Sequence, residues 1–183
     1  MSEQRLDEVL PAACSGQPWA LRIVYDELAP RVHGYLRSRG ASEPEDLTSE
    51  VFLAVFPRLA SVTGGAAGLR TLVFSVAHAR LVDDLRRRAR RPPTSGLDDL
   101  RDETAAPSAE TEALDRLGSA HVQHVLSGLP DDQRDVLLLR IVADLTVEQV
   151  AEAIGRSAGA VKQLQRRGLL ALRAQVADGR VTL

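Results

Sequence analysis

Basic and amide side chains recur at helical spacing near the end of the chain, within LTVEQVAEAIGRSAGAVKQLQRRG (145–168). At steps of about 100° per residue, one arc of a helix carries Lys162, Gln163, Arg166, Arg167 and Arg173. Arginine and lysine donate hydrogen bonds to phosphates and to guanine edges in the major groove, and glutamine does so to adenine. The first four residues are therefore candidates for DNA contact, although a lone basic helix is more often a solvated surface.

The residues in front of this arc have the spacing of a helix-turn-helix. Such a motif needs a small residue where the two helices cross, a turn residue that tolerates unusual backbone angles, and an apolar inner face on the second helix. These places are filled by Ala151, Gly155, Val161 and Leu164. Because a helix-turn-helix is chiefly a device for docking in a DNA groove, the motif favours DNA binding as the role of the basic arc.

The composition predicts an all-α protein. Of the 183 residues, 44% are hydrophobic but 3% are aromatic, so the core has to be built from aliphatic side chains on helices. The single cysteine, Cys14, excludes an internal disulfide and a cysteine-rich zinc site. His121 and His124 have the spacing to share a helix face, but no carboxylate or cysteine ligand stands beside them, so a solvated face is preferred. We expect no metal and no cofactor.

The sequence gives no sign of an enzyme. Paired catalytic carboxylates, a phosphate-binding loop and an activated nucleophile are not recognisable, and each lone Ser, His or Asp is better explained as a helix cap or a surface group.

Charge divides the chain into three parts. Residues 1–91 hold 13 basic and 11 acidic side chains, residues 92–117 hold 2 and 7, and residues 118–183 hold 8 and 7, which together give the net charge of −2. The middle part begins with Pro-Pro and is rich in Ser, Thr, Ala and acid, which is typical of a solvated linker. We therefore expect two small helical domains, 1–91 and 118–183, joined by a flexible acidic linker over 92–117.

Apolar residues at helical spacing predict the helices of both domains. The expected ranges are 21–40, 42–59 and 69–91 in the first domain, and roughly 109–126, a helix after Pro130, 147–154, and a helix N-capped by Ser157 in the second. Two pairs have the spacing of capping boxes, Ser42 with Glu45 and Thr146 with Gln149. The glycine-rich stretch SVTGGAAG (61–68) is expected to be a flexible turn.

Three segments resemble a known family in their order and spacing. They are EDLTSEVFLAVF (45–56), GLRTLVFSVAHARLVDDLRRR (68–88) and LPDDQRDVLLLRIVADLTVEQVAEAIGRSAGAVKQLQRRG (129–168). Together they resemble the two conserved regions of bacterial sigma-70-type initiation factors of the small extracytoplasmic-function (ECF) group, from about 19 to 176. The resemblance implies a region 2 helical bundle and a region 4 helix-turn-helix, in a subunit that gives RNA polymerase its promoter specificity without chemistry of its own.

The resemblance also implies roles for individual residues. Those that match the segment docking on the clamp helices of core polymerase are Asp46, Glu50, Phe52 and Phe56, and for the two phenylalanines plain core packing is an equal alternative. Those that match the part recognising and opening the −10 element, where cations are needed for the DNA backbone, are Arg80, Arg86, Arg87 and Arg88. Those in the helix that reads the −35 element are Lys162, Gln163, Arg166 and Arg167.

The sequence departs from the family pattern in the −10 region. Relatives usually carry Phe and Trp in the stretch corresponding to LRTL (69–72), where this chain has Leu69 and Leu72, and Ala79 stands where Asn is common. Base stacking in this region is therefore not implied. The acid that matches a family position beside the arginines is Asp83, expected to orient them.

The resemblance implies core RNA polymerase and promoter DNA as partners, and an anti-sigma factor as a further one, for which exposed Leu170 is a candidate contact. A net charge of −2 is low for a protein that binds DNA alone through counterion release, so we expect weak promoter binding outside the holoenzyme. Since no membrane-length apolar run and no charged-then-apolar leader are present, a cytoplasmic protein without membrane insertion is expected.

Two other function classes remain open at this point. A freestanding helix-turn-helix regulator would form a stable homodimer on a palindromic site, whereas no obligate homo-oligomer is expected for a sigma factor. A degenerate sigma-like protein would bind polymerase but fail to open DNA.

Overall fold

The computed structural model describes residues 3–90 and 125–177. The elements in the first range are α1 (Glu3–Cys14), α2 (Pro18–Ser38), α3 (Pro44–Val55), the 3-10 helix η1 (Phe56–Ser61) and α4 (Gly65–Arg90). Those in the second range are α6 (Asp131–Ile141), α7 (Val147–Ile154) and α8 (Ala158–Ala177). The predicted all-α class is confirmed for these residues. The predicted linker and nearly all of the helix predicted over 109–126 lie outside them.

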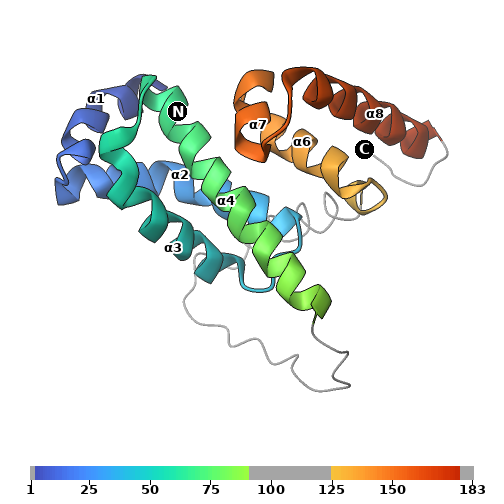
Figure 1. Ribbon diagram of the computed structural model, residues 1–183, viewed down its shortest axis with the longest axis horizontal. Coiled ribbons are helices and arrows are strands. Elements are labelled where there is room, and N and C mark those ends of the chain that lie inside the picture. The colour runs from blue at the N-terminus through green and yellow to red at the C-terminus, as the bar shows by residue number, and fades with distance from the viewer. Residues whose placement is uncertain (1–2, 91–124, 178–183) are drawn as a thin grey trace, which may run out of the picture.

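Helices α1 to α4 form one bundle, on the left of Figure 1. Helix α2 buries the residues that the periodicity predicts, with Val24, Leu28, Val32 and Leu36 each at most 2% exposed. Tyr35 and Phe74 add an edge-to-face ring contact between α2 and α4, with centroids 6.1 Å apart. Apart from such rings, the core is aliphatic, as the composition predicts.

Helix α1 was not among the predicted elements. It packs on α2 and α4 through Leu6, Leu10 and Ala13, all of them buried. Asp7 on this helix accepts a hydrogen bond from the backbone N–H of Ala66 at 2.6 Å and so satisfies a free donor at the start of α4. A carboxylate far away in the sequence thus replaces a local cap.

The predicted capping box of Ser42 and Glu45 is wrong. Helix α3 begins at Pro44, where the missing N–H of proline costs no hydrogen bond, and no side chain caps it. Ser42 instead donates from its hydroxyl to Asp84 Oδ1 at 2.8 Å and from its backbone N–H to Oδ2 at 3.2 Å. The buried carboxylate of Asp84 competes for the groups that the box would have used.

The stretch 61–68 is also less of a turn than predicted, because α4 begins at Gly65. Gly64 and Gly65 have φ of +80° and +63°, values that glycine adopts without strain. Gly68 lies within the helix, where a Cβ atom would stand 1.7 Å from the carbonyl oxygen of Thr63. Two of the glycines therefore serve the turn, and Gly68 serves the close approach of the turn to the helix.

Helices α6, α7 and α8 form the second unit, and its helix-turn-helix is confirmed. The Thr146–Gln149 capping box is present with both hydrogen bonds, and Gly155 ends α7 in the left-handed conformation at φ +65°. The Ser157 hydroxyl accepts from the N–H of Ala160 at 3.2 Å, as predicted for the N-cap of α8. Val161 on the inner face of α8 is fully buried.

The two units lie against each other in Figure 1, with α7 beside α4 and α6 beside α2. Val142, at the end of α6, comes within 3.8 Å of the position that a Cβ atom would take at Gly34 in α2. The side chain of Gln149 donates to the carbonyl oxygen of Ala67 at 3.2 Å.

Candidate nucleic-acid and polymerase interfaces

Helix α8 presents the predicted basic arc to solvent. Lys162, Gln163, Arg166 and Arg167 are all exposed. On the opposite side, Val161 and Gly168 are buried, and a Cβ at Gly168 would stand 2.9 Å from Leu137 Cδ1 on α6. Close packing of the inner face therefore fixes the direction in which the four polar side chains project, as a groove-reading helix requires.

Apolar side chains continue this surface toward the end of α8. Leu169 is 40% and Leu170 is 52% exposed, and both line a shallow groove with Lys162, Arg166 and Arg173. The predicted exposure of Leu170 is confirmed. An apolar strip beside a basic one suits a protein contact as well as a DNA contact.

The turn of the motif is tied to α6. Arg156 follows Gly155, and its guanidinium donates to the carboxylate of Asp132 at 2.8 Å. Both side chains are about half exposed, so this pair orients the turn more than it stabilises the fold.

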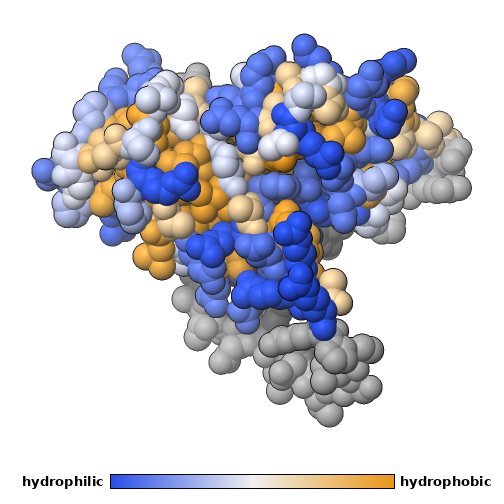
Figure 2. All heavy atoms as spheres, in the orientation of Figure 1, coloured by the Kyte–Doolittle hydropathy of each residue, from blue (hydrophilic) through white to orange (hydrophobic). Residues whose placement is uncertain are grey.

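The C-terminal half of α4 carries the second predicted basic group, and Figure 2 shows a strongly hydrophilic surface at this end of the helix. Arg80, Arg86, Arg87 and Arg88 are all exposed. Asp84, which is 5% exposed, lies 3.8 Å from Arg87 and 3.4 Å from Arg88. The Arg88 guanidinium also donates to the carbonyl oxygen of Gly40 at 2.5 Å.

The acid that orients these arginines is therefore Asp84, whereas the prediction named its neighbour Asp83, which is exposed. The two positions differ by about 100° around the helix, which turns Asp84 toward the bundle and Asp83 toward solvent. The family departures also separate by burial. Leu69 is fully buried in the bundle, Leu72 is partly buried and Ala79 is exposed. Leu69 is thus a core residue here and offers no surface on which a base could stack.

Helix α3 presents two acids and covers an aromatic cluster. Asp46 and Glu50 are exposed four residues apart, and Glu50 lies 4.0 Å from Arg80 of α4. Phe52 is 2% exposed, with its ring 4.8 Å from that of Tyr25 and 5.6 Å from that of Phe56. For Phe52 the structure thus shows the core packing that was one of its two interpretations.

An exposed apolar surface lies beside this cluster. Leu53 is 73% and Trp19 is 55% exposed, and Tyr25 and Phe56 line a shallow groove on the same bundle. Figure 2 shows hydrophobic side chains in the area of α3. The sequence signal for Leu53 was present but unused, since an apolar residue next to Phe52 falls outside the buried stripe of the helix.

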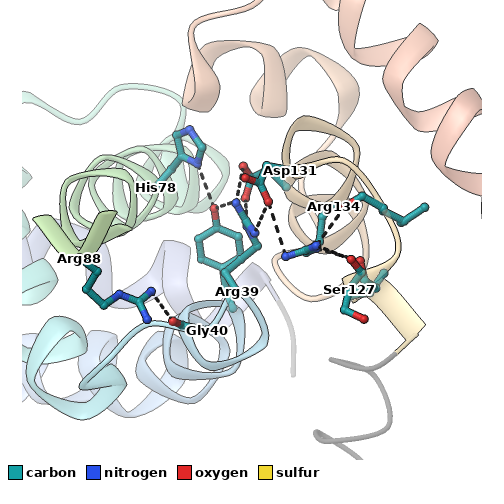
Figure 3. A network of polar contacts seen from close by, with 11 residues as sticks. Arg39, Gly40, His78, Arg88, Ser127, Asp131 and Arg134 are labelled. Atoms are coloured by element: carbon teal, nitrogen blue, oxygen red, sulfur yellow. Dashed lines mark hydrogen bonds and ion pairs between the residues drawn. The ribbon is translucent and has the colours of Figure 1, made fainter. Parts of the chain in front are cut away.

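A buried polar network joins the two units (Figure 3), and sequence reasoning missed it. The Arg39 guanidinium on α2 donates from Nε to Asp135 Oδ1 at 2.5 Å and from Nη1 to Asp131 Oδ1 at 3.2 Å, both on α6. Tyr35 donates its hydroxyl to Asp135 Oδ1 at 3.2 Å, and its oxygen lies 3.0 Å from His78 Nδ1 of α4. Arg39 and Asp135 are each 5% exposed.

Proton counting assigns the donor in this network. A tyrosine hydroxyl has one proton, and here it goes to Asp135, so His78 must carry a proton on Nδ1 and donate it to the Tyr35 oxygen. Burial raises the pKa of Tyr35 well above its ordinary value, and the Asp135 carboxylate raises it further. Burial lowers the pKa of His78, although Asp135 offsets part of this shift. For Arg39, burial acts to lower the pKa but the contact with Asp135 outweighs it.

Comparison with known proteins gives these surfaces a context. Residues 24–91 match the family model described as Sigma-70 region 2, and residues 125–174 match that of Sigma-70 region 4. The chain is 30% identical to the ECF RNA polymerase sigma factor SigD of Mycobacterium tuberculosis, over 96% of this chain and 86% of that protein. The chain belongs to the ECF group of the sigma-70 family. It is an RNA polymerase sigma factor, which confers promoter specificity in the holoenzyme.

Two further comparisons agree with this assignment. The sigma factor is 30% identical to ECF RNA polymerase sigma factor ShbA of Streptomyces griseus, over 88% of this chain and 90% of that one. The solved structure of CnrH, in complex with the cytosolic domain of CnrY, superposes with a TM-score of 0.69 over 94% of this chain and 97% of that chain, at 19% identity, which shows a shared fold. Family membership favours a polymerase subunit over a freestanding regulator.

Other kinds of site find no support in the described ranges. Residues 3–90 and 125–177 contain no group of three or more His, Cys, Asp or Glu side chains arranged to hold a metal ion, and His121 and His124 lie outside them. None of the described helices of the sigma factor combines the length and hydropathy that a bilayer-spanning segment needs.

Proposed function

We propose that α8 reads the −35 element through Lys162, Gln163, Arg166 and Arg167. The observation that carries this proposal is their joint exposure on a helix whose opposite face is packed on α6. Arginine and lysine would serve guanine or phosphate, and the Gln163 amide would serve adenine. The two arginines are adjacent, so they would reach neighbouring positions along the groove.

For the −10 element, we propose backbone contacts from Arg80, Arg86, Arg87 and Arg88 along the exposed side of α4. Their roles differ in this proposal. Arg86 is exposed and is the clearest candidate for a phosphate contact. Arg88 already holds Asp84 and Gly40, so it would position the helix end as well as add charge.

For core polymerase, we propose a docking face on α3. Asp46 and Glu50 would pair with basic groups of the polymerase clamp, and Phe56 would add apolar contact together with Leu53. Phe52 supports this face from below, through its ring contacts with Tyr25 and Phe56. A charged rim around a partly apolar centre is the usual composition of such an interface.

We further propose domain limits of 1–91 and 118–183 with a linker over 92–117, and regulation by an anti-sigma factor. The groove beside Leu169 and Leu170 is a candidate contact for that inhibitor, since its apolar side chains exceed what a DNA-reading helix needs. The solved complex of CnrH with the cytosolic domain of CnrY supports the general idea of a protein partner for this fold.

Run-off transcription tests the α8 proposal. Purified core polymerase and the sigma factor are incubated with a library of genomic fragments, and the transcript starts reveal the promoter elements. With a promoter found in this way, the double change Arg166→Ala and Arg167→Ala is expected to lower transcription, because each lost base contact costs about 1–3 kcal/mol. Arg58→Ala removes an exposed arginine on η1 and serves as the matched control.

The outcome that contradicts the α8 proposal is a double variant that transcribes as well as the Arg58 control. A gel shift adds an independent check of the polymerase requirement. The isolated protein is expected to bind the promoter fragment weakly and without the sequence preference of the holoenzyme, because its net charge of −2 supplies little counterion release.

A further inference from the structure

The contact between the two units is built differently from a chance encounter of surfaces. Its centre is the ion pair of Arg39 with Asp135, which lie 96 positions apart in the sequence and are withdrawn from water by the packing of α6 on α2. Charged side chains are rarely buried without a partner, and here each has its complement in a hydrogen-bonding position. Tyr35 and His78 extend the same network to α4 (Figure 3).

A second contact fastens α7 to α4. The Gln149 side chain uses its carbonyl oxygen to accept from the N–H of Thr146 at 2.7 Å in the capping box, and its amide nitrogen to donate to the carbonyl oxygen of Ala67 at 3.2 Å. The Thr71 hydroxyl donates to the same Ala67 oxygen, and Thr71 is 5% exposed. The first helix of the helix-turn-helix therefore covers the N-terminal half of α4.

The covered surface is part of the segment proposed to act on the −10 element. Residues 61–72, which include the turn before α4 and the LRTL stretch, stand where the family resemblance assigns the handling of unstacked bases. With α7 against Ala67 and Thr71, a DNA strand cannot occupy that face of α4. The basic end of α4, from Arg80 onward, stays exposed.

Distances along promoter DNA lead to the same conclusion. The −10 and −35 elements are about 25 base pairs apart by name, which at about 3.4 Å per base pair is about 85 Å. Helix α4 packs on α7 and α7 packs on α8, so two packing distances place α8 within about 20 Å of α4. Even when the full length of the 26-residue α4, about 39 Å, is added, the two reading helices span less than the DNA requires.

We infer that this structure is a closed, self-blocking state of the sigma factor, held by the Arg39–Asp135–Tyr35 latch and by Gln149, which has to open before α4 and α8 engage one promoter. The inference rests on the proposed roles of these two helices. Opening is allowed by chain length, because the stretch between Arg90 and Val125 can extend by about 110 Å. The closed state would keep free sigma factor off DNA, and binding to polymerase would release it.

A reversible disulfide across the interface tests the inference. Gly34→Cys and Val142→Cys are combined in a Cys14→Ser background, since a Cβ at position 34 would lie 3.8 Å from the Val142 side chain. Oxidation is expected to join the two cysteines within one chain, which a non-reducing gel detects. The oxidised protein is expected to give at least tenfold fewer run-off transcripts, and dithiothreitol is expected to restore them. Each single-cysteine variant, treated in the same way, is the control.

The results separate this inference from the proposed function. A disulfide-bonded protein that transcribes as well as its reduced form overturns the inference, and so does a cysteine pair that never joins. Loss of start-site selection by the reduced form, when both single variants retain it, would instead count against the roles given to α4 and α8. If the double variant does not fold, Asp135→Asn supplies the second measurement. It should raise the accessibility of a cysteine at position 34, and unchanged accessibility overturns the inference.

Discussion

The change of Asp135 to Asn tests the latch directly. The Arg39 side chain is 3% and the Asp135 side chain 7% exposed, so the change leaves a buried guanidinium without its counter-charge. Breaking a buried ion pair by removing one partner costs about 3–5 kcal/mol. Asparagine keeps a neutral oxygen that can still accept from Arg39, so we expect the low end, about 3 kcal/mol. Because about 1.4 kcal/mol corresponds to a factor of ten, the ratio of closed to open molecules should fall about 100-fold.

Thiol labelling measures this ratio without a need to populate the open state. A cysteine placed at Gly34, in a Cys14→Ser background, faces Val142 in the closed state and reacts with a thiol reagent when the interface opens. Under conditions where opening is fast, the labelling rate follows the open population. It should therefore rise about 100-fold in the Asp135→Asn variant.

The matched control is Asp132→Asn, the same chemical change on the same helix. Asp132 pairs with Arg156 inside the second unit, with both side chains about half exposed, so its loss should cost at most about 1 kcal/mol. Labelling of the denatured proteins corrects for the intrinsic reactivity of the thiol. If the Asp135 variant labels no faster than the Asp132 variant, the buried pair does not hold the units together and the reasoning fails.

Three other predictions follow from particular contacts. The pKa of His78 is lowered in the closed state, so its proton binds more tightly once the interface opens; closure should be strongest above about pH 6.5 and weaken as the pH falls toward the lowered pKa, and His78→Gln should flatten this dependence in the labelling assay. The groups that face this ring are Tyr35, Arg39, Asp132 and Asp135. Gly68→Ala should lower the free energy of unfolding by about 1–3 kcal/mol in urea, because its Cβ would overlap the Thr63 carbonyl, whereas Gly159→Ala, with open space around it, should be neutral or stabilising. Thr146→Ala should cost about 1 kcal/mol by removing the N-cap of α7, and Thr146→Ser should retain most of it; equal stability of the two would contradict the capping role.

The local signals were most reliable where a motif closes on itself. The capping box of Thr146, the left-handed Gly155 and the Ser157 cap all depend on groups within four residues, so their spacing in the sequence was enough. The same reasoning failed at Ser42. There the spacing was equally good, but a carboxylate from another helix offered a buried acceptor, and no local pattern contains that information.

The directions of side chains were predictable to the accuracy of the helical period. The arc of α8 and the stripes of α2 and α3 came out as expected, whereas a step of one residue separated the predicted Asp83 from the observed Asp84. One step is about 100° around a helix, which is enough to move a charge from solvent to the core. Helix α1 was missed, and with it the cap that Asp7 gives to α4.

By itself, the sequence determined the helical class, the helix-turn-helix, the basic arc on α8 and membership of the sigma-70 family, because periodicity, capping and motif spacing are properties of short stretches of chain. Tertiary structure alone decided that Arg39 and Asp135 meet, that Phe52 and Leu69 are core, and that α7 lies on α4. These facts depend on which surfaces pack together across almost a hundred residues. Burial then gives a charge or an aromatic ring a role that its type and its neighbours in the sequence do not reveal.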